Sequence, residues 1–135
     1  MNMLCHGEMP IDTENDIVMA RKSVREAAVS LGFGVTDVTR IVTAASELTR
    51  NIYVYAGSGI MRWQSINENN LGLELVFEDH GPGITDITLA MEPGYTTGKG
   101  LGMGLPGTKR LMDEMEIMSE IGKGTTICIR KWLRR

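Results

Sequence analysis

Residues 71–83 read LGLELVFEDHGPG, and this stretch decides the fold of the 135-residue chain. Every second side chain in its first half is large and apolar, which is typical of a strand that buries one face. These side chains are Leu71, Leu73, Leu75 and Phe77. Asp79 has the same parity, so the strand is expected to end with a carboxylate on its apolar face.

Other strands are predicted on both sides of this one. Residues 60–66 precede it across a short polar run, and the two segments are expected to form an antiparallel hairpin. Residues 115–121 and 125–133 flank a glycine turn and predict a second hairpin. A short strand is expected over 8–12, and residues 1–8 are expected to be a loose lead-in.

Two long helices are predicted before the first hairpin. Thr13 and Asp16 have the spacing of a capping box, and Gly32 is a residue that commonly ends a helix. The second helix is expected from about Thr36 to Gly57. The apolar stripes of the two helices contain Ile17, Ala20, Val24, Ala27 and Leu31, and then Val38, Ile41, Ala45, Leu48 and Ile52.

A third helix is predicted over 105–114, where Pro106 suits the first turn. Residues 85–91 favour a short helix, and residues 92–104, rich in Gly, Thr and Pro, are expected to be a mobile loop. The main elements therefore follow the order strand, helix, helix, strand, strand, helix, strand, strand. This order predicts an α+β two-layer sandwich, with helices on one face of a mostly antiparallel sheet, as a single domain over 1–135.

Composition excludes several classes of protein. Apolar residues make up 42% and charged residues 23%, which is typical of a globular chain and unlike a disordered one. The formal charge of −3 lacks the basic field of a general nucleic-acid binder, and no apolar run is long enough for a membrane span. Cys5 and Cys128 have no CxxC spacing, so we expect two reduced thiols in a cytoplasmic protein.

Glu47 and Asn51 are the first candidate functional residues. They are four residues apart in the second helix, so their side chains lie one above the other at the rim of its apolar stripe. A carboxylate there can accept a proton or orient a nucleophile, and a carboxamide oxygen can bind a hard cation such as Mg²⁺. The alternative is a solvated glutamate beside a helix-terminal asparagine.

Asp79 is the second candidate, because a partly buried carboxylate needs a hydrogen-bond donor. An exocyclic amine of a purine is a suitable donor. Gly81 and Gly83 lack a Cβ, so a flat ring can approach their backbone closely. The alternative is an ordinary turn after a strand.

The run Gly100-Leu101-Gly102-Met103-Gly104 leads directly into the third helix. Glycines allow successive amides to turn toward one anion, and the helix N-terminus favours negative charge, so this run suits a phosphate. It lacks the strand before it that a dinucleotide fold requires and the Gly-Lys-Ser/Thr of a Walker motif. A further segment, residues 122–125, reads Gly-Lys-Gly-Thr and by itself indicates only a hairpin turn.

Taken together and in this order, the four motifs resemble the GHKL ATP-binding family, which includes gyrase, the histidine kinases and the anti-sigma-factor kinases. Three stretches, residues 46–53, 78–83 and 100–114, are similar to the small serine/threonine-protein kinases of the stressosome within that family. The similarity extends over roughly residues 10–133.

The resemblance implies a role for each motif residue. Asn51 would coordinate Mg²⁺ on the ATP phosphates, and Glu47 would be the catalytic base or an orienting carboxylate. Asp79 would accept a hydrogen bond from the adenine amine, with Gly83 beside the ring and Thr125 supporting the adenine side.

The same resemblance implies that residues from about Glu92 to Gly104 form a lid over ATP. The lid residues expected around the phosphates are Gly100, Gly102 and Gly104, with Leu101 and Met103 between them. Lys99 is a further candidate for phosphate contact, and the alternative is a solvated loop lysine.

The implied reaction is transfer of the γ-phosphoryl group of ATP to a serine of a STAS-domain protein of the RsbS type. The implied partners are that protein, an RsbR-like stressosome scaffold, and a PP2C-type phosphatase of the RsbU type that the freed kinase activates. The alternative is an anti-sigma factor of the SpoIIAB or RsbW type, which also sequesters a sigma factor. A histidine kinase core is less favoured, because His6 and His80 are the chain's two histidines and no helical hairpin carries either.

Overall fold

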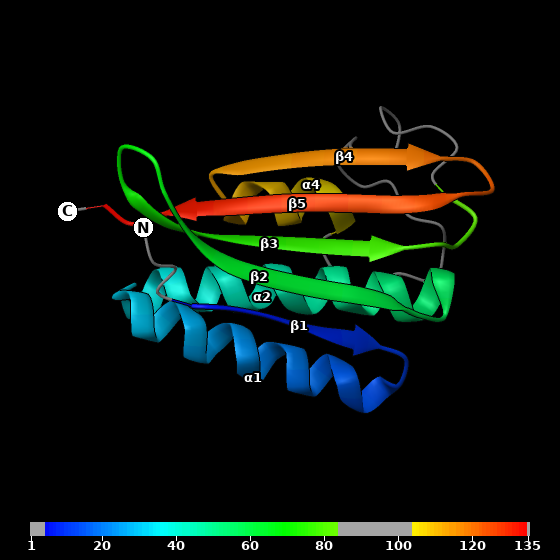
Figure 1. Cartoon of the computed structure of the whole chain (residues 1–135), viewed down its shortest axis with the longest axis horizontal. Helices are drawn as coiled ribbons and strands as arrows, with labels where there is room; N and C mark the ends of the chain where they lie inside the picture. The colour runs from blue at the N-terminus through cyan, green and yellow to red at the C-terminus, as the bar shows by residue number, and fades with distance from the viewer. Residues whose placement is uncertain (1–4, 84–103, 135) are drawn as a thin grey trace.

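Five antiparallel strands form one sheet in the order β1-β2-β3-β5-β4, and helices cover one of its faces (Figure 1). The computed structural model describes residues 5–83 and 104–134. The strands are β1 (His6–Ile11), β2 (Gly59–Asn67), β3 (Leu71–Asp79), β4 (Glu114–Glu120) and β5 (Gly124–Trp132). The helices are α1 (Glu14–Leu31), α2 (Val35–Asn51), α4 (Gly104–Leu111) and a short π-helix, η1 (Ile52–Ala56). The predicted α+β architecture is confirmed.

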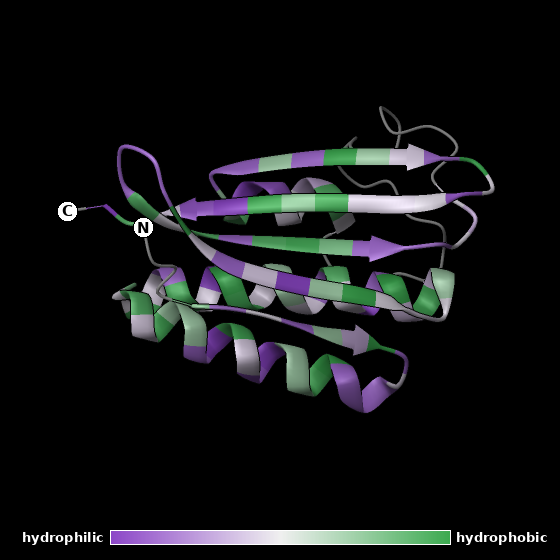
Figure 2. Ribbon diagram, viewed as in Figure 1, coloured by the Kyte–Doolittle hydropathy of each residue, from purple (hydrophilic) through white to green (hydrophobic). Residues whose placement is uncertain are grey.

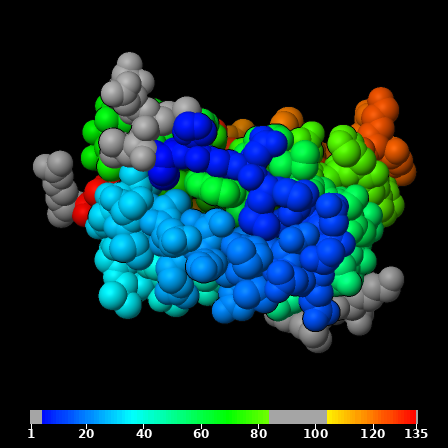
Figure 3. Space-filling model, turned by 60° about the horizontal axis from the view of Figure 1, so that its bottom comes forward, coloured from blue at the N-terminus to red at the C-terminus, as the bar shows by residue number. Residues whose placement is uncertain are grey.

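The predicted capping box begins α1. The amide of Asp16 donates to the hydroxyl of Thr13 at 3.3 Å, and the amide of Thr13 donates to the Asp16 carboxylate at 3.0 Å. Hydrogen bonds from the amides of Asp12 and Thr13 lower the pKa of Asp16. Gly32 ends the helix in the left-handed conformation, with φ of 100°. In this position α1 lies along β1 (Figure 3).

The core lies between the helices and the apolar face of the sheet. Figure 2 shows hydrophobic residues interspersed with hydrophilic ones along the strands and the helices. In β3, Leu73, Leu75 and Phe77 are buried, and Asp79 ends the same face partly buried, as the alternation predicted. Full burial of one such side chain contributes roughly 1.5–3 kcal/mol. Every residue of the two predicted helix stripes is buried: Ile17, Ala20, Val24, Ala27, Leu31, Val38, Ile41, Ala45, Leu48 and Ile52.

The first strand starts earlier than its sequence predicted. Residues 6–8 are paired with β2, His6 with Gln64 and Glu8 with Arg62, so the expectation of a loose lead-in as far as residue 8 was wrong for these residues. The sequence pattern does not indicate a strand at residues 6–8, because Gly7 interrupts the alternation of apolar and polar side chains. The indole of Trp63 fills the space beside Gly7, and it lies so close that a Cβ on Gly7 would overlap it.

The third helix is shorter than predicted and ends at Leu111 rather than at residue 114. The ammonium of buried Lys131 donates to the Leu111 carbonyl at 2.9 Å and so satisfies a carbonyl at the helix end. The amide of Asp113 then donates to the carbonyl of Arg130 at 3.0 Å, and Glu114 is already the first residue of β4. Asp113 and Glu114 therefore pair with β5 instead of continuing the helix.

The predicted end of the second helix at Gly57 is correct, but the last turn is not α-helical. From Ile52 onward the chain forms the π-helix η1, closed by a hydrogen bond of 2.9 Å from the Gly57 amide to the Ile52 carbonyl. Gly57 has φ of 85°, a value that favours glycine. Single π-turns of this kind occur frequently at functional sites.

The face of the sheet opposite the helices is polar. Arg130 in β5 bridges to Glu74 in β3 at 2.7 Å and to Glu114 and Glu116 in β4 at 3.0 and 3.1 Å. Burial and the charge of Glu74 raise the pKa of the neighbouring Cys128 thiol to about 11. Antiparallel sheets commonly leave one face to water in this way. Within the described ranges, no helix has both the length and the apolar composition needed to cross a membrane.

Candidate functional site

The C-terminal end of α2 carries Glu47 and Asn51, one turn apart. Because Leu48 and Ile52 are buried in the core, the residues beside them are held at its rim. The side chain of Glu47 is only 15% exposed, and its Oε1 accepts a hydrogen bond from Arg50 at 3.2 Å. Asn51 is half-buried. The predicted placement of the two residues is therefore what the structure shows.

Asp79 lies at the end of β3, opposite Gly59 of β2 and Thr125 of β5. Its Oδ1 accepts a hydrogen bond from the amide of Gly81 at 2.9 Å, which fixes the turn that follows. Its Oδ2 has no hydrogen-bond partner among the residues that the structure describes. A half-buried carboxylate oxygen in this state can accept one hydrogen bond from a ligand.

The turn after β3 packs closely on η1, and this contact brings the two groups of residues together. A Cβ on Gly81 would lie 2.6 Å from the Cβ of Ala56. A Cβ on Gly59 would lie 2.8 Å from Ile52 and 3.3 Å from the Cβ of Asp79. The π-helix that follows Asn51 therefore contacts both the turn after Asp79 and the residue of β2 that pairs with Asp79. The residue pattern did not predict this contact.

The turn between β4 and β5 closes the same end of the sheet. Thr125 is buried, and its hydroxyl is 2.8 Å from the hydroxyl of Ser119. The amide of Gly122 donates to the carbonyl of Pro82 at 2.9 Å, so this turn holds the loop that follows Asp79. The segment that by itself indicates only a hairpin turn therefore lies at the same end of the sheet as Asp79, next to which the resemblance had placed Thr125.

Gly124 makes the closest of these approaches, and its replacement by alanine is expected to destabilise the protein. Its φ is +123°, and an added Cβ would overlap the carbonyl oxygen of Asp79. We expect Gly124→Ala to lower the free energy of unfolding by about 1–3 kcal/mol, measured by urea denaturation. Gly122→Ala is the matched control, because Gly122 also has positive φ (+79°) but no heavy atom within 4 Å of an added Cβ. An equal loss in both variants would show that the close approach does not matter.

Gly104 is the first residue of α4 and has φ of 68°, and α4 packs against α2. A helix N-terminus can bind a phosphate, and that role for this end of α4 stays a prediction. The remaining residues of the predicted phosphate loop and lid lie outside the described residues, as does the helix predicted over 85–91. These loop residues are Lys99, Gly100, Leu101, Gly102 and Met103.

The donor atoms present fit a single Mg²⁺ held mainly by phosphate. The described residues contain no group of three or more His, Cys, Asp or Glu side chains that could hold a metal ion. Mg²⁺ commonly takes only one or two protein ligands together with substrate phosphates, and an amide oxygen such as that of Asn51 is a suitable donor.

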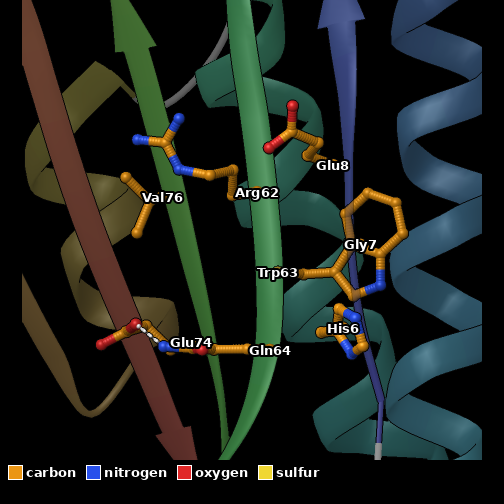
Figure 4. A pocket seen from close by; sticks show the side chains of 8 residues that line it. All are labelled: His6, Gly7, Glu8, Arg62, Trp63, Gln64, Glu74 and Val76. Carbon is orange, nitrogen blue, oxygen red and sulfur yellow. Dashed lines mark hydrogen bonds between the residues drawn. The ribbon is translucent and has the colours of Figure 1, made fainter.

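A hollow of about 440 Å³ lies elsewhere, on the polar face of the sheet (Figure 4). Within it, Gln64 donates a hydrogen bond to Glu74 at 2.8 Å. None of the residues singled out from the sequence lines it. Its lining consists of His6, Gly7, Glu8, Arg62, Trp63, Gln64, Glu74 and Val76.

Comparison with known proteins agrees with the predicted family. Residues 10–131 match the family model described as histidine kinase-like ATPase domain. Serine/threonine-protein kinase RsbT of Bacillus subtilis (strain 168) is 53% identical over 125 residues, which cover 92% of this chain and 94% of that protein. An anti-sigma F factor of Caldanaerobacter subterraneus subsp. tengcongensis is 33% identical over 123 residues, covering 86% and 85% of the two chains.

Solved structures show the same fold at low sequence identity. The RsbU and RsbW domains of a Mycobacterium tuberculosis protein superpose with a TM-score of 0.64 at 22% identity, covering 96% of this chain and 33% of that one. A histidine kinase domain from Erythrobacter litoralis superposes with a TM-score of 0.54 at 18% identity, covering 93% and 62%.

Proposed function

Because this chain belongs to the histidine kinase-like ATPase domain family and is a serine/threonine-protein kinase, as its sequence predicted, we propose that it phosphorylates a serine of a STAS-domain protein of the RsbS type. The observation that carries the proposal is the 53% identity to RsbT over 92% of this chain. An ATP site is supported by the meeting of three elements at one end of the sheet: α2 with Glu47 and Asn51, β3 with Asp79, and the β4–β5 turn. The site would hold ATP there, with adenine at Asp79 and phosphates near the N-terminus of α4. The cysteines are both free thiols, which supports a cytoplasmic setting.

In the proposed reaction, the bond between the γ-phosphorus of ATP and its bridging oxygen breaks, and that oxygen leaves with ADP. The substrate hydroxyl oxygen forms the new bond to phosphorus, and its proton passes to the Glu47 carboxylate. Glu47 Oε2 can receive that proton, because Arg50 occupies Oε1. Asn51 would hold Mg²⁺, which supplies positive charge for the phosphate oxygens. Positioning and charge account for most of such catalysis.

Asp79 is expected to select adenine. The exocyclic amine of adenine can donate to Oδ2, whereas guanine presents an acceptor at that position. We expect Asp79→Asn to lose about 10- to 100-fold in ATP affinity, because a hydrogen bond to a charged group contributes about 1.5–3 kcal/mol. Calorimetric titration with ATP and GTP measures both affinity and selectivity.

The neighbouring Glu78 provides the matched control for this experiment. It faces the polar side of the sheet and is paired with Arg62 at 2.9 Å, so Glu78→Gln should bind ATP as the wild type does. Equal affinity of the wild type for ATP and GTP would contradict the assignment of Asp79.

The proposed partners are the RsbS-like substrate, an RsbR-like scaffold and an RsbU-like phosphatase. The similarity to RsbT supports this set, and so does the Mycobacterium tuberculosis structure, in which an RsbU domain accompanies a domain of this fold. A phosphoserine adds about −1.5 to −2 charges, enough to weaken an interface that contains carboxylates. Phosphorylation would thus release the kinase from one partner to bind the other.

Transfer of radiolabelled phosphate from ATP to purified STAS-domain proteins tests the proposal, followed by capture of the phosphatase. We expect label on a serine of an RsbS-like protein and retention of the RsbU-like phosphatase. The anti-sigma F relative at 33% identity is the reason to include a sigma factor in the capture step. Retention of the sigma factor in place of the phosphatase would favour that alternative.

A further inference from the structure

Arg50 is the one described side chain that hydrogen-bonds to Glu47. Its guanidinium donates to Oε1 at 3.2 Å from one turn further along α2, and the two side chains are 35% and 15% exposed. A carboxylate so little exposed is costly to bury without a charged or hydrogen-bonded partner. Glu47 Oε2 has no hydrogen-bond partner within residues 5–83 and 104–134.

We propose that Arg50 is a positioning residue for phosphoryl transfer, holding Glu47 by Oε1 so that Oε2 is presented to the substrate hydroxyl. This inference rests on the proposed role of Glu47. By fixing one oxygen, Arg50 leaves the other free to accept the hydroxyl proton as the new oxygen–phosphorus bond forms. In this role Arg50 acts on Glu47 and not on the nucleotide, so its removal should lower the rate of transfer rather than the affinity for ATP.

The same helix contains a second ion pair of the same spacing. Comparing variants of the two pairs distinguishes a positioning role of Arg50 from a general effect on helix stability. Arg40 binds Asp37 at 3.1 Å, also three residues apart, near the start of α2 and far along the helix from Glu47. Its two side chains are 50% and 31% exposed. Exposed pairs of this kind contribute little to stability. Arg40→Ala is therefore the matched control for Arg50→Ala.

The first experiment measures kcat, KM for ATP and thermal stability of three variants with a STAS-domain substrate. We expect Arg50→Ala to lower kcat about 10- to 100-fold, the factor that corresponds to one charged hydrogen bond, with KM for ATP within about twofold. Arg50→Lys should recover most of the rate, because the contact uses a single N–H. Arg40→Ala should match the wild type. Unchanged kcat in Arg50→Ala, or a raised KM with kcat intact, would overturn the proposal.

A double-mutant cycle tests whether Arg50 acts through Glu47. In a Glu47→Ala background, Arg50→Ala should cause no further loss, because the group that it positions is gone. Equal losses in both backgrounds would show that Arg50 acts independently, and would overturn the proposal.

A measurement without substrate distinguishes failure of this inference from failure of the proposed function. In the nucleotide-free protein, the ¹³C resonance of the Glu47 carboxyl carbon should move on Arg50→Ala and stay in place on Arg40→Ala. If that resonance behaves as expected but the wild type transfers no phosphate, the contact stands and the proposed reaction fails, and with it the positioning role. If the wild type transfers phosphate and the resonance does not move, the inference alone fails.

Discussion

Replacing Glu47 by alanine should lower the rate of phosphoryl transfer about 10²- to 10⁴-fold and leave ATP affinity nearly unchanged, the effect expected for loss of a general base. The carboxylate lies at the rim of the core, one turn before Asn51, and is held by Arg50 on one oxygen. Removing it deletes the proposed acceptor for the substrate proton but no contact proposed for adenine or metal. Single-turnover transfer and calorimetric ATP titration measure the two quantities separately.

The control for this variant is Glu26→Ala, which removes an exposed carboxylate from the outer face of α1. It should leave both transfer and binding unchanged. Normal transfer by Glu47→Ala would show that Glu47 serves another purpose and that the acceptor of the proton lies elsewhere.

Replacing Asn51 by alanine should reduce both nucleotide binding and transfer. Its carboxamide is the metal ligand proposed at the end of α2, where the chain changes from α-helix to the π-helix η1. Mutating a residue that only supports a metal ligand typically lowers metal affinity about 10- to 100-fold. Because Asn51 is proposed as a ligand itself, we expect a loss of at least about 10-fold in affinity for Mg²⁺-ATP. The difference in ATP affinity between the variant and the wild type should shrink when a chelator removes Mg²⁺, because the wild type then has no metal ion for Asn51 to bind.

The exposed Asn69, in the turn between β2 and β3, supplies the matched asparagine control. Asn69→Ala should bind Mg²⁺-ATP as the wild type does. A loss in Asn51→Ala that is equally large with and without Mg²⁺ would mean that Asn51 contacts the nucleotide or supports the fold instead.

Local patterns in the sequence were sufficient to predict the elements and the positions of the polar residues at their ends. The Thr13 capping box, the alternation through Phe77 and the parity of Asp79 each depend on neighbours within a few residues. For this reason the ends of α1 and β3 lie where the sequence placed them. Glu47 was likewise placed at the rim of the core by helical spacing alone.

The differences arise where partners distant in the sequence decide the outcome. The end of α4 depends on Lys131 reaching the Leu111 carbonyl, and no pattern near residue 111 indicates this. The π-turn after Asn51 depends on the fit of Ile52 against Gly59 and of Ala56 against Gly81. Helical periodicity cannot report such contacts, because an α-helix and a π-helix have nearly the same apolar pattern over one turn.

The contact between Arg50 and Glu47 could have been found in the sequence, since residues three apart on a helix are neighbours. The same spacing also joins Arg40 and Asp37, so the pattern alone does not indicate which pair serves the site. Burial distinguishes them, and burial depends on the assembled sheet.

The strand order has a consequence for the synthesis of the protein. β5 is the last strand along the chain, yet it lies inside the sheet, between β3 and β4. A ribosome therefore releases β1 to β3 while the outer edge of β3, including Asp79, still has no neighbour. Until β5 emerges and Thr125 pairs with Asp79, the growing chain exposes a strand edge that other chains could join. Because the proposed adenine site includes both Asp79 and Thr125, that site can be completed only after this insertion.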